Sequence, residues 1–158
     1  FKGIPAVYFN TLLAAANDHE LAARTGMSRS LNRGKWLPAG LEAMLSDPGS
    51  PAARSLAFHK RVMKVRGEHP AFHPDGAQKV AALSDTVLAI EREAPDGSER
   101  ILALANLGAQ PEAVSKSVLK AHGWQGVLPV DLIEGRDVSG RDGKISLGAY
   151  AAAWLRCG

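Results

Sequence analysis

Residues 1–26 read FKGIPAVYFNTLLAAANDHELAARTG and open on a run of strand-like residues. The segment 3–9 is almost continuously apolar and holds β-branched and aromatic side chains, which is typical of a strand buried on both faces of a parallel sheet. Such a strand needs parallel neighbours joined by crossovers of about a dozen residues or more. Only Phe1 and Lys2 precede this one, so we expect the rest of its sheet to lie outside this chain.

The composition is typical of a water-soluble globular protein. The 158 residues carry a formal net charge of +3, and 46% of them are hydrophobic. The basic residues are scattered, which argues against a nucleic-acid-binding stripe. Cys157 is the only cysteine, so neither an internal disulfide nor a cysteine metal cluster is possible. No run reaches the roughly 20 apolar residues that a membrane-spanning helix needs, and we expect no membrane partner.

The first half of the chain predicts helices. Ser50-Pro51 is a strong helix start, because serine caps the free N–H groups and proline suits the first helical position. The helix that follows has a wide apolar arc, which is typical of a helix packed against two bodies. The expected helices are 12–16, 20–24, 37–45 and 51–67.

The second half predicts an all-β domain. Short runs with apolar alternation are separated by turn sequences such as APDGSE at 94–99. Turns every eight to twelve residues or so favour a small antiparallel sandwich. The expected strands are 79–83, 86–93, 100–107, 112–119, 132–133, 144–147 and 150–155.

Four motifs give the chain a family resemblance that extends over nearly its whole length. GIPAVYF at 3–9 resembles the eighth strand of the (β/α)8 barrels of the α-amylase family. NDHELAARTGMSRSLNR at 17–33 resembles the sucrose phosphorylase branch of that family, glycoside hydrolase family 13. RGEHPAF at 66–72 and AYAAAWL at 149–155 are similar to the same branch.

The resemblance implies an α+β fragment taken from the C-terminal portion of a larger enzyme. Residues 1–75 would be the eighth strand, loop and last helices of a catalytic barrel. Residues 77–158 would be the C-terminal all-β domain, a small antiparallel β-sandwich. The missing N-terminal part of the barrel would then be the structural partner of this chain.

The resemblance also implies an activity for the parent protein, namely that of a retaining α-glucoside phosphorylase. Such an enzyme makes α-glucose 1-phosphate with inorganic phosphate as co-substrate and uses no cofactor. Sucrose, glucosylglycerate and glucosylglycerol would each fit as the glucosyl donor. The carboxylates of the reaction, an Asp nucleophile and a Glu acid/base, follow earlier barrel strands. We therefore expect no catalytic residue in this chain, an inactive isolated chain and a cytoplasmic parent.

Barrel enzymes carry their sites on the loops after the strands, which is where the polar segment 17–33 falls. By its match to the family pattern, Arg29 would hold hydroxyls of the glucosyl unit, since a guanidinium presents five fixed donors. Asn17, Asp18 and Arg33 are further substrate-binding candidates. Relatives carry Arg-Asp-Ile-Asn-Arg where this chain has RSLNR at 29–33, so a carboxylate that would orient Arg29 is missing.

Two alternatives remain open. One is an α-glucosidase or amylase-type hydrolase of the same family, and the other is a non-catalytic carbohydrate-binding module. Such modules present exposed aromatic side chains, for which Trp36 and Trp124 are the candidates; Tyr8 and Tyr150 are expected to be buried. A metal site is not expected, because Pro70 and Pro74 interrupt the helix that would pair His69 with His73.

Overall fold

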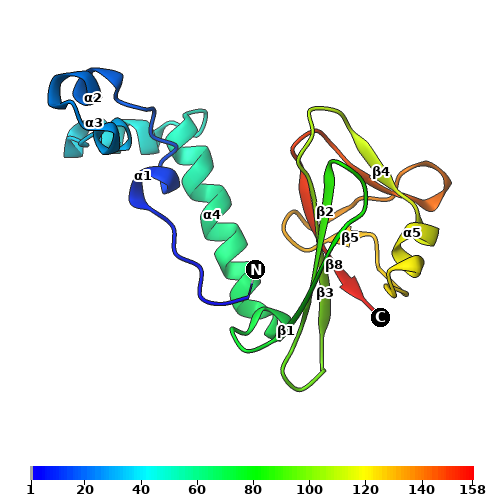
Figure 1. Ribbon diagram of the computed structural model, residues 1–158. Coiled ribbons are helices and arrows are strands. Elements are labelled where there is room, and N and C mark those ends of the chain that lie inside the picture. Colours follow the sequence, from blue (N-terminus) through cyan, green and yellow to red (C-terminus); the bar gives the residue numbers. More distant parts are fainter. Residues whose placement is uncertain (1) are drawn as a thin grey trace. The chain divides into compact units, whose positions relative to one another are not determined.

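The computed structural model describes residues 2–158 and divides into two compact units, which are coloured by sequence position in Figure 1. The helical unit comprises Pro5–Met63. The β unit comprises Lys64–Gly158 together with residues 2–4. None of the helices within residues 2–158 combines the length and apolarity that a membrane span requires.

Helices form close to those predicted over 20–24, 37–45 and 51–67, but the helix predicted over 12–16 is wrong, because the chain turns after Leu12 and Ala14 adopts a left-handed φ of 47°. The long helix α4 begins after Ser50, whose hydroxyl accepts a hydrogen bond from the Ala53 backbone N–H at 3.1 Å. A serine at this position satisfies one of the helix's free donors, and Pro51 follows at the first helical residue. The helices are α1 (Phe9–Leu12), α2 (His19–Thr25), the 3-10 helix η1 (Ser28–Asn32), α3 (Pro38–Ser46) and α4 (Pro51–Glu68).

The strand predicted over 3–9 does not form. The backbone there is mostly irregular, Tyr8 is extended, and α1 begins at Phe9. Ile4 is 84% exposed, and Tyr8 is exposed as well, so the expectation that Tyr8 is buried is also wrong. A strand is held by hydrogen bonds to a neighbouring strand, and none of the described strands pairs with this segment.

A four-stranded antiparallel sheet organises the β unit. Its strand order is β1-β2-β3-β8, and β1 lies at an edge with no strand on its outer side among the described residues. The strands are β1 (Ala77–Ala82), β2 (Val87–Glu93), β3 (Arg100–Asn106) and β8 (Ala152–Cys157). Each lies within a few residues of a predicted strand, and the α+β class with an antiparallel sheet is confirmed.

Shorter elements complete the β unit. Two ladders pair β4 (Glu112–Val114) with β7 (Ile145–Leu147), and β5 (Val130–Asp131) with β6 (Arg136–Asp137). The remaining helices are η2 (Pro70–Phe72), α5 (Lys116–Ala121) and η3 (Arg141–Gly143). The second layer over the sheet therefore consists of a short ladder and a helix, where the sequence predicted a full sandwich.

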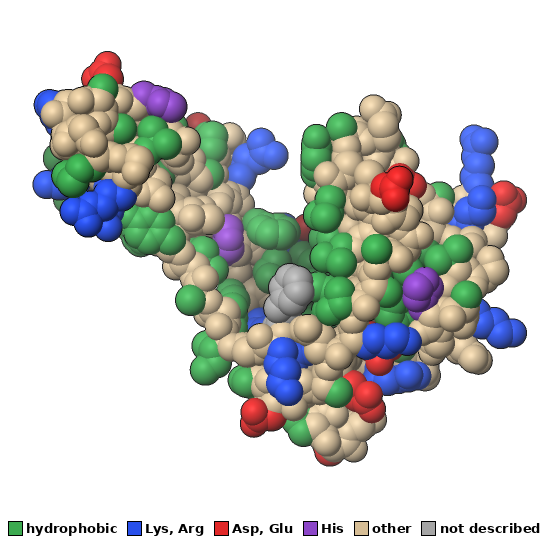
Figure 2. Space-filling model, in the orientation of Figure 1, with side chains coloured by type: hydrophobic (Ala, Val, Ile, Leu, Met, Phe, Trp, Pro, Cys, Tyr) green, Lys and Arg blue, Asp and Glu red, His purple; other side chains and the backbone are tan. Residues whose placement is uncertain are grey.

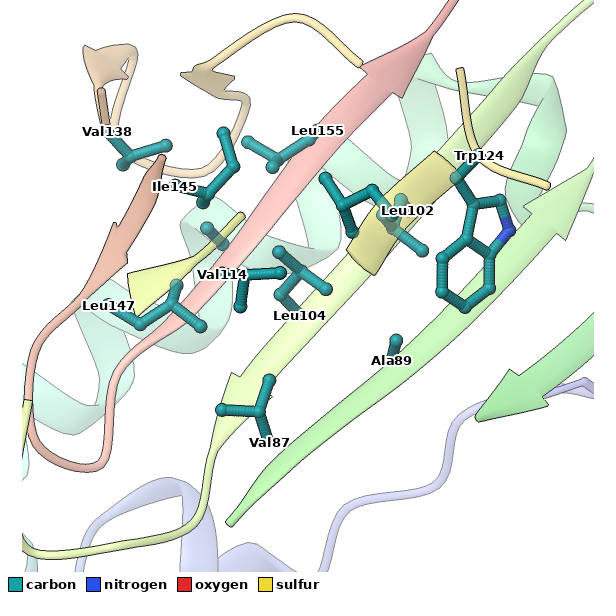
Figure 3. Close-up of a cluster of buried hydrophobic side chains, with 12 residues drawn as sticks. Val87, Ala89, Leu102, Leu104, Val114, Trp124, Val138, Ile145, Leu147 and Leu155 are labelled. Carbon is teal, nitrogen blue, oxygen red and sulfur yellow. The ribbon is translucent and has the colours of Figure 1, made fainter. Parts of the chain in front are cut away.

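The main core lies between the inner face of the sheet and this second layer (Figure 3). Leu102 and Leu104 of β3 and Leu155 of β8 come from the sheet, while Ile145 and Leu147 of β7 come from the ladder. Trp124, just after α5, closes the same cluster. Burial of these apolar side chains on alternate strand positions is what fixes the register of the sheet.

The strand predicted over 112–119 is wrong in its second half. The chain leaves β4 after Val114 and enters α5, because the Ser115 hydroxyl accepts a hydrogen bond from the Val118 N–H at 3.2 Å. This is the geometry of a helix N-cap. The helix places the Leu119 side chain in the core. In a strand, the side chains of Val118 and Leu119 would instead have pointed to opposite faces of the sheet.

Candidate functional site

A pocket of about 440 Å³ opens in the helical unit between two loop segments. One wall runs from Ala15 to Glu20, and the other from Gly34 to Trp36. Its chemically active lining is an amide, two carboxylates, an imidazole, an ammonium group and an indole: Asn17, Asp18, Glu20, His19, Lys35 and Trp36.

Asn10 fastens part of one pocket wall to α1. Its side-chain amide donates to the carbonyl oxygens of Asn32 at 2.9 Å and Gly34 at 3.2 Å, and its Oδ1 accepts from the Trp36 indole N–H at 2.8 Å. The side chain is 8% exposed, so all three bonds form in a largely dry setting. Asn10 was not among the residues predicted from the sequence, where its only signal is a polar residue inside the apolar run YFNTLL.

Asp18 lies in the pocket wall but also has a structural task. Its Oδ1 accepts from the Leu21 N–H at 2.7 Å, which caps α2, and its own N–H donates to the Leu31 carbonyl at 2.6 Å. The first bond satisfies a helix donor, and the second ties α2 to η1. Asn17 is exposed on the same wall.

Arg29 and Arg33 are not among the pocket-lining residues. Both side chains are exposed, and the Arg29 guanidinium contacts the Met27 sulfur at 3.6 Å. Ser30, the second residue of RSLNR, is buried and accepts a hydrogen bond from the Thr25 hydroxyl at 2.9 Å. Its side chain is therefore committed to internal contacts. The structure thus brings Asn17 and Asp18 together at the pocket and leaves the two arginines outside it.

The pocket has the groups that bind a polyhydroxylated molecule. The lining combines an indole with an amide, carboxylates and a cation, so hydroxyl groups would find both donors and acceptors. Within residues 2–158, no three His, Cys, Asp or Glu side chains are close enough together to hold a metal ion.

The aromatic residues considered for a surface platform are arranged differently from the sequence expectation. Trp124 is 1% exposed in the core, which excludes it as an exposed platform, and Trp36 is half-buried with its N–H engaged by Asn10. Tyr150, expected to be buried, is 73% exposed, because it lies in the turn before β8 with a backbone φ of 53°.

Comparisons with known proteins show which enzymes this chain resembles in fold and sequence. No model of a known protein family matches the sequence. Among solved structures, the trehalulose synthase MutB from Pseudomonas mesoacidophila MX-45 superposes with a TM-score of 0.52 over 90% of this chain and 24% of its own, at 18% identity. AmyP in complex with maltose gives a TM-score of 0.52 over 67% of this chain and 21% of its own, at 22% identity.

The curated relatives share more sequence identity with this chain than these two solved structures do. Glucosylglycerate phosphorylase of Allomeiothermus silvanus is 34% identical over 80% of this chain and 23% of its own length. The Spirochaeta thermophila enzyme of the same name is 33% identical over 97% of this chain and 27% of its own. Sucrose phosphorylase of Streptococcus mutans is 31% identical over 66% of this chain and 21% of its own. The chain thus spans about a quarter of the length of the curated relatives it matches.

The solved structures carry the fold of α-amylase superfamily enzymes, glycoside hydrolase family 13. The sequence relatives narrow this assignment. The chain belongs to the sucrose phosphorylase-like branch of that family, of whose proteins it represents a C-terminal portion.

Proposed function

We propose that the chain is part of a retaining α-glucoside phosphorylase that releases α-glucose 1-phosphate from its donor. The observation that carries the proposal is the 33% identity to a glucosylglycerate phosphorylase over 97% of this chain. Glucosylglycerate is the first donor to test, because two of the three relatives compared above act on it by name. Sucrose and glucosylglycerol follow, and inorganic phosphate is the acceptor.

The N-terminal and C-terminal halves of the chain have different roles in this proposal. Residues 1–75 end the catalytic barrel, and residues 77–158 form the C-terminal β domain. The unpaired segment 3–9 supports this division, since it has the composition of a buried parallel strand and is extended at Tyr8 without a partner. The remainder of the barrel would supply its neighbours and the catalytic carboxylates.

The loop after that segment forms one side of the sugar site. Arg29 holds hydroxyls of the glucosyl unit, and the exposure of its guanidinium leaves its donors accessible. Asn17 and Asp18 act from the pocket wall, and Arg33 acts at the end of η1. Contacts to hydroxyls remote from the reacting carbon lower the activation barrier, because they hold the sugar ring in the orientation needed for attack.

The test is phosphate-dependent turnover by the protein that the source gene encodes when it is read upstream of the Phe1 codon. We expect α-glucose 1-phosphate from glucosylglycerate, and no product from the isolated 158-residue chain. Release of glucose without phosphate would identify a hydrolase and overturn the proposal. Absence of upstream in-frame sequence would overturn it as well.

Arg29 is tested in the same protein. Arg29→Ala should lower kcat/KM by about a hundredfold, because a lost orienting contact misplaces the ring. Arg29→Lys should recover only a fraction, since an ammonium group lacks the planar fork. Arg24→Ala, at an exposed position in the last turn of α2, is the matched control and should stay close to wild type.

A further inference from the structure

Another pocket, of about 290 Å³, lies within the β unit between α5 and the segment that follows it. Gly123, with a φ of 84°, turns the chain at the end of α5, and the Trp124 N–H donates to the Leu119 carbonyl at 2.9 Å. The Leu128 N–H then donates to the Arg156 carbonyl of β8 at 2.9 Å. These bonds hold the intervening segment beside α5 and give the pocket its second wall.

One part of the pocket lining is apolar. Leu119 and Trp124 belong to the main core of the β unit, and Val127 packs against that core. Such a lining favours the apolar body of a small organic molecule, and a volume of about 290 Å³ suits a ligand of that size.

The other part of the lining carries positive charge. Lys116 and Lys120 are one helical turn apart on α5, both are exposed, and neither is paired with a carboxylate among residues 2–158. Like charges at this spacing repel each other, so an anion between them would relieve the repulsion. The Lys79 ammonium group lies 5.2 Å from the centroid of the Trp124 ring and adds a positive charge nearby. Figure 2 shows Lys and Arg side chains close to the region of α5.

The indole N–H of Trp124 points independently to a ligand. The residue is 1% exposed, and its Nε1 has no hydrogen-bond partner among the described residues. Figure 3 shows this nitrogen on the edge of the ring that faces away from Leu102 and Leu104. Folded proteins satisfy nearly all of their buried donors, so this N–H needs an acceptor from outside the described chain.

We propose that the pocket between α5 and residues 124–127 binds a small organic anion, namely a carboxylate or phosphate carried on an apolar body. The anionic group lies between Lys116 and Lys120, and one of its oxygens accepts from the Trp124 N–H. The apolar body packs on Leu119 and Val127. The inference does not rest on the proposed function, because every residue of this pocket belongs to the β unit.

The experiment follows the three indole N–H resonances of the ¹⁵N-labelled 158-residue chain by NMR during titration. Benzoate and phenyl phosphate are the probes, while inorganic phosphate tests the charge alone and benzyl alcohol tests the apolar body alone. We expect benzoate or phenyl phosphate to shift the Trp124 resonance saturably and to leave those of Trp36 and Trp154 in place. Inorganic phosphate and benzyl alcohol should bind at least about tenfold more weakly, because each makes only half of the contacts.

Two lysine pairs give a matched comparison. Lys116→Gln combined with Lys120→Gln should raise the Kd at least about tenfold, because the charge-assisted contacts are lost. Lys60→Gln combined with Lys64→Gln removes the same charge from exposed lysines at the same spacing on α4, and should leave the Kd unchanged.

Trp124→Phe assigns the indole resonance and tests the unpaired donor, since phenylalanine keeps an aromatic ring and lacks the N–H. Binding measured by calorimetry should weaken about tenfold in this variant. The lysine variants keep the test decisive if the tryptophan variant does not fold, because their side chains are exposed.

Absence of a saturable Trp124 shift with both probes would overturn the proposal. Equal weakening by the two lysine pairs would overturn it as well, since attraction to net charge would then explain the binding. The same holds if inorganic phosphate binds as tightly as phenyl phosphate, because the apolar lining would contribute nothing. Calorimetry on the longer gene product should give the same Kd, and loss of binding there would overturn the proposal for the parent protein.

Discussion

A residue in the pocket wall can combine a structural role with the functional role proposed for it, and Asp18 is the clearest case. Its carboxylate caps α2 through the Leu21 N–H and also lines the pocket. Loss of activity on removing Asp18 would therefore not by itself identify a sugar ligand. A substitution that keeps the cap and changes the charge separates the two roles.

Asp18→Ala should destabilise the helical unit by about 1 kcal/mol, because the Leu21 N–H loses the carboxylate that accepts its hydrogen bond. Asp18→Asn should be close to neutral, since asparagine caps as well as aspartate. Amide exchange of α2 in the longer protein, where this segment should be protected, measures both. Equal loss in the two variants would show that the cap contributes little to stability.

Cys157 gives the chain a pH dependence of stability at high pH. Burial, followed by the negative charge of Glu91, raises the pKa of this thiol to about 11 from a model-compound value of 9.0. The thiolate is thus favoured in the unfolded chain above pH 9.0. The stability linked to the neutral thiol is fully present below that pH and is lost between about 9 and 11.

Alkylation of Cys157 should accordingly be slow at neutral pH and should rise with an apparent pKa near 11 in the folded chain. The urea-unfolded chain should titrate near the ordinary thiol value. A folded-state profile that coincides with the unfolded one would show that the thiol is not shielded. The Cys157→Ser variant should lose the stability change between pH 9 and 11.

At the scale of elements, sequence signals that span only a few residues predicted several helices and strands correctly. Ser50-Pro51 predicted the start of α4, and apolar alternation predicted the four strands of the main sheet. The error at 112–119 arose from reading alternation past Ser115, a residue that favours helix caps. The error at 3–9 has another cause: an apolar run becomes a strand only beside a partner strand.

Ser115→Ala should therefore destabilise the β unit by about 1 kcal/mol through loss of the α5 cap. Ser117→Ala is the matched control, because the Ser117 hydroxyl contacts Ser115 at 2.8 Å without capping the helix. Urea unfolding monitored by tryptophan fluorescence in a Trp36→Phe background, where only Trp124 and Trp154 of the β unit report, compares them. A Ser117 variant as unstable as the Ser115 variant would assign the effect to the serine pair.

At the scale of the whole molecule, the two units differ in how many buried hydrophobic residues stabilise them. The β unit has a twelve-residue buried core, while the only buried hydrophobic residues within Pro5–Met63, which the structure describes in full, are Leu13 and Ala52. Family resemblance supplied the candidate residues, of which Asn17 and Asp18 line the pocket while Arg29 and Arg33 do not. The pocket itself was not predicted, because Asn10 holds its wall through contacts with residues more than 20 positions away in sequence.

Residues up to about 50 should consequently exchange amide hydrogens quickly in the isolated chain, while β2 and β3 stay protected. Hydrogen exchange with mass spectrometry checks this at peptide resolution. Uniform protection would instead indicate that the helical unit is stable without further partners. In the longer protein of the proposed function, the same segment should become protected.

The outer edge of β1, which is unpaired among the described strands, affects how the isolated chain behaves in solution. An unpaired strand edge offers its N–H and C=O groups to any other chain, and β1 lacks a proline to blunt it. Concentrated preparations should therefore form gels or fibrous aggregates through edge-to-edge strand pairing, and dilution should slow this aggregation. β1 already carries one charged residue, Lys79, and a second charge introduced on this edge strand should slow the association further.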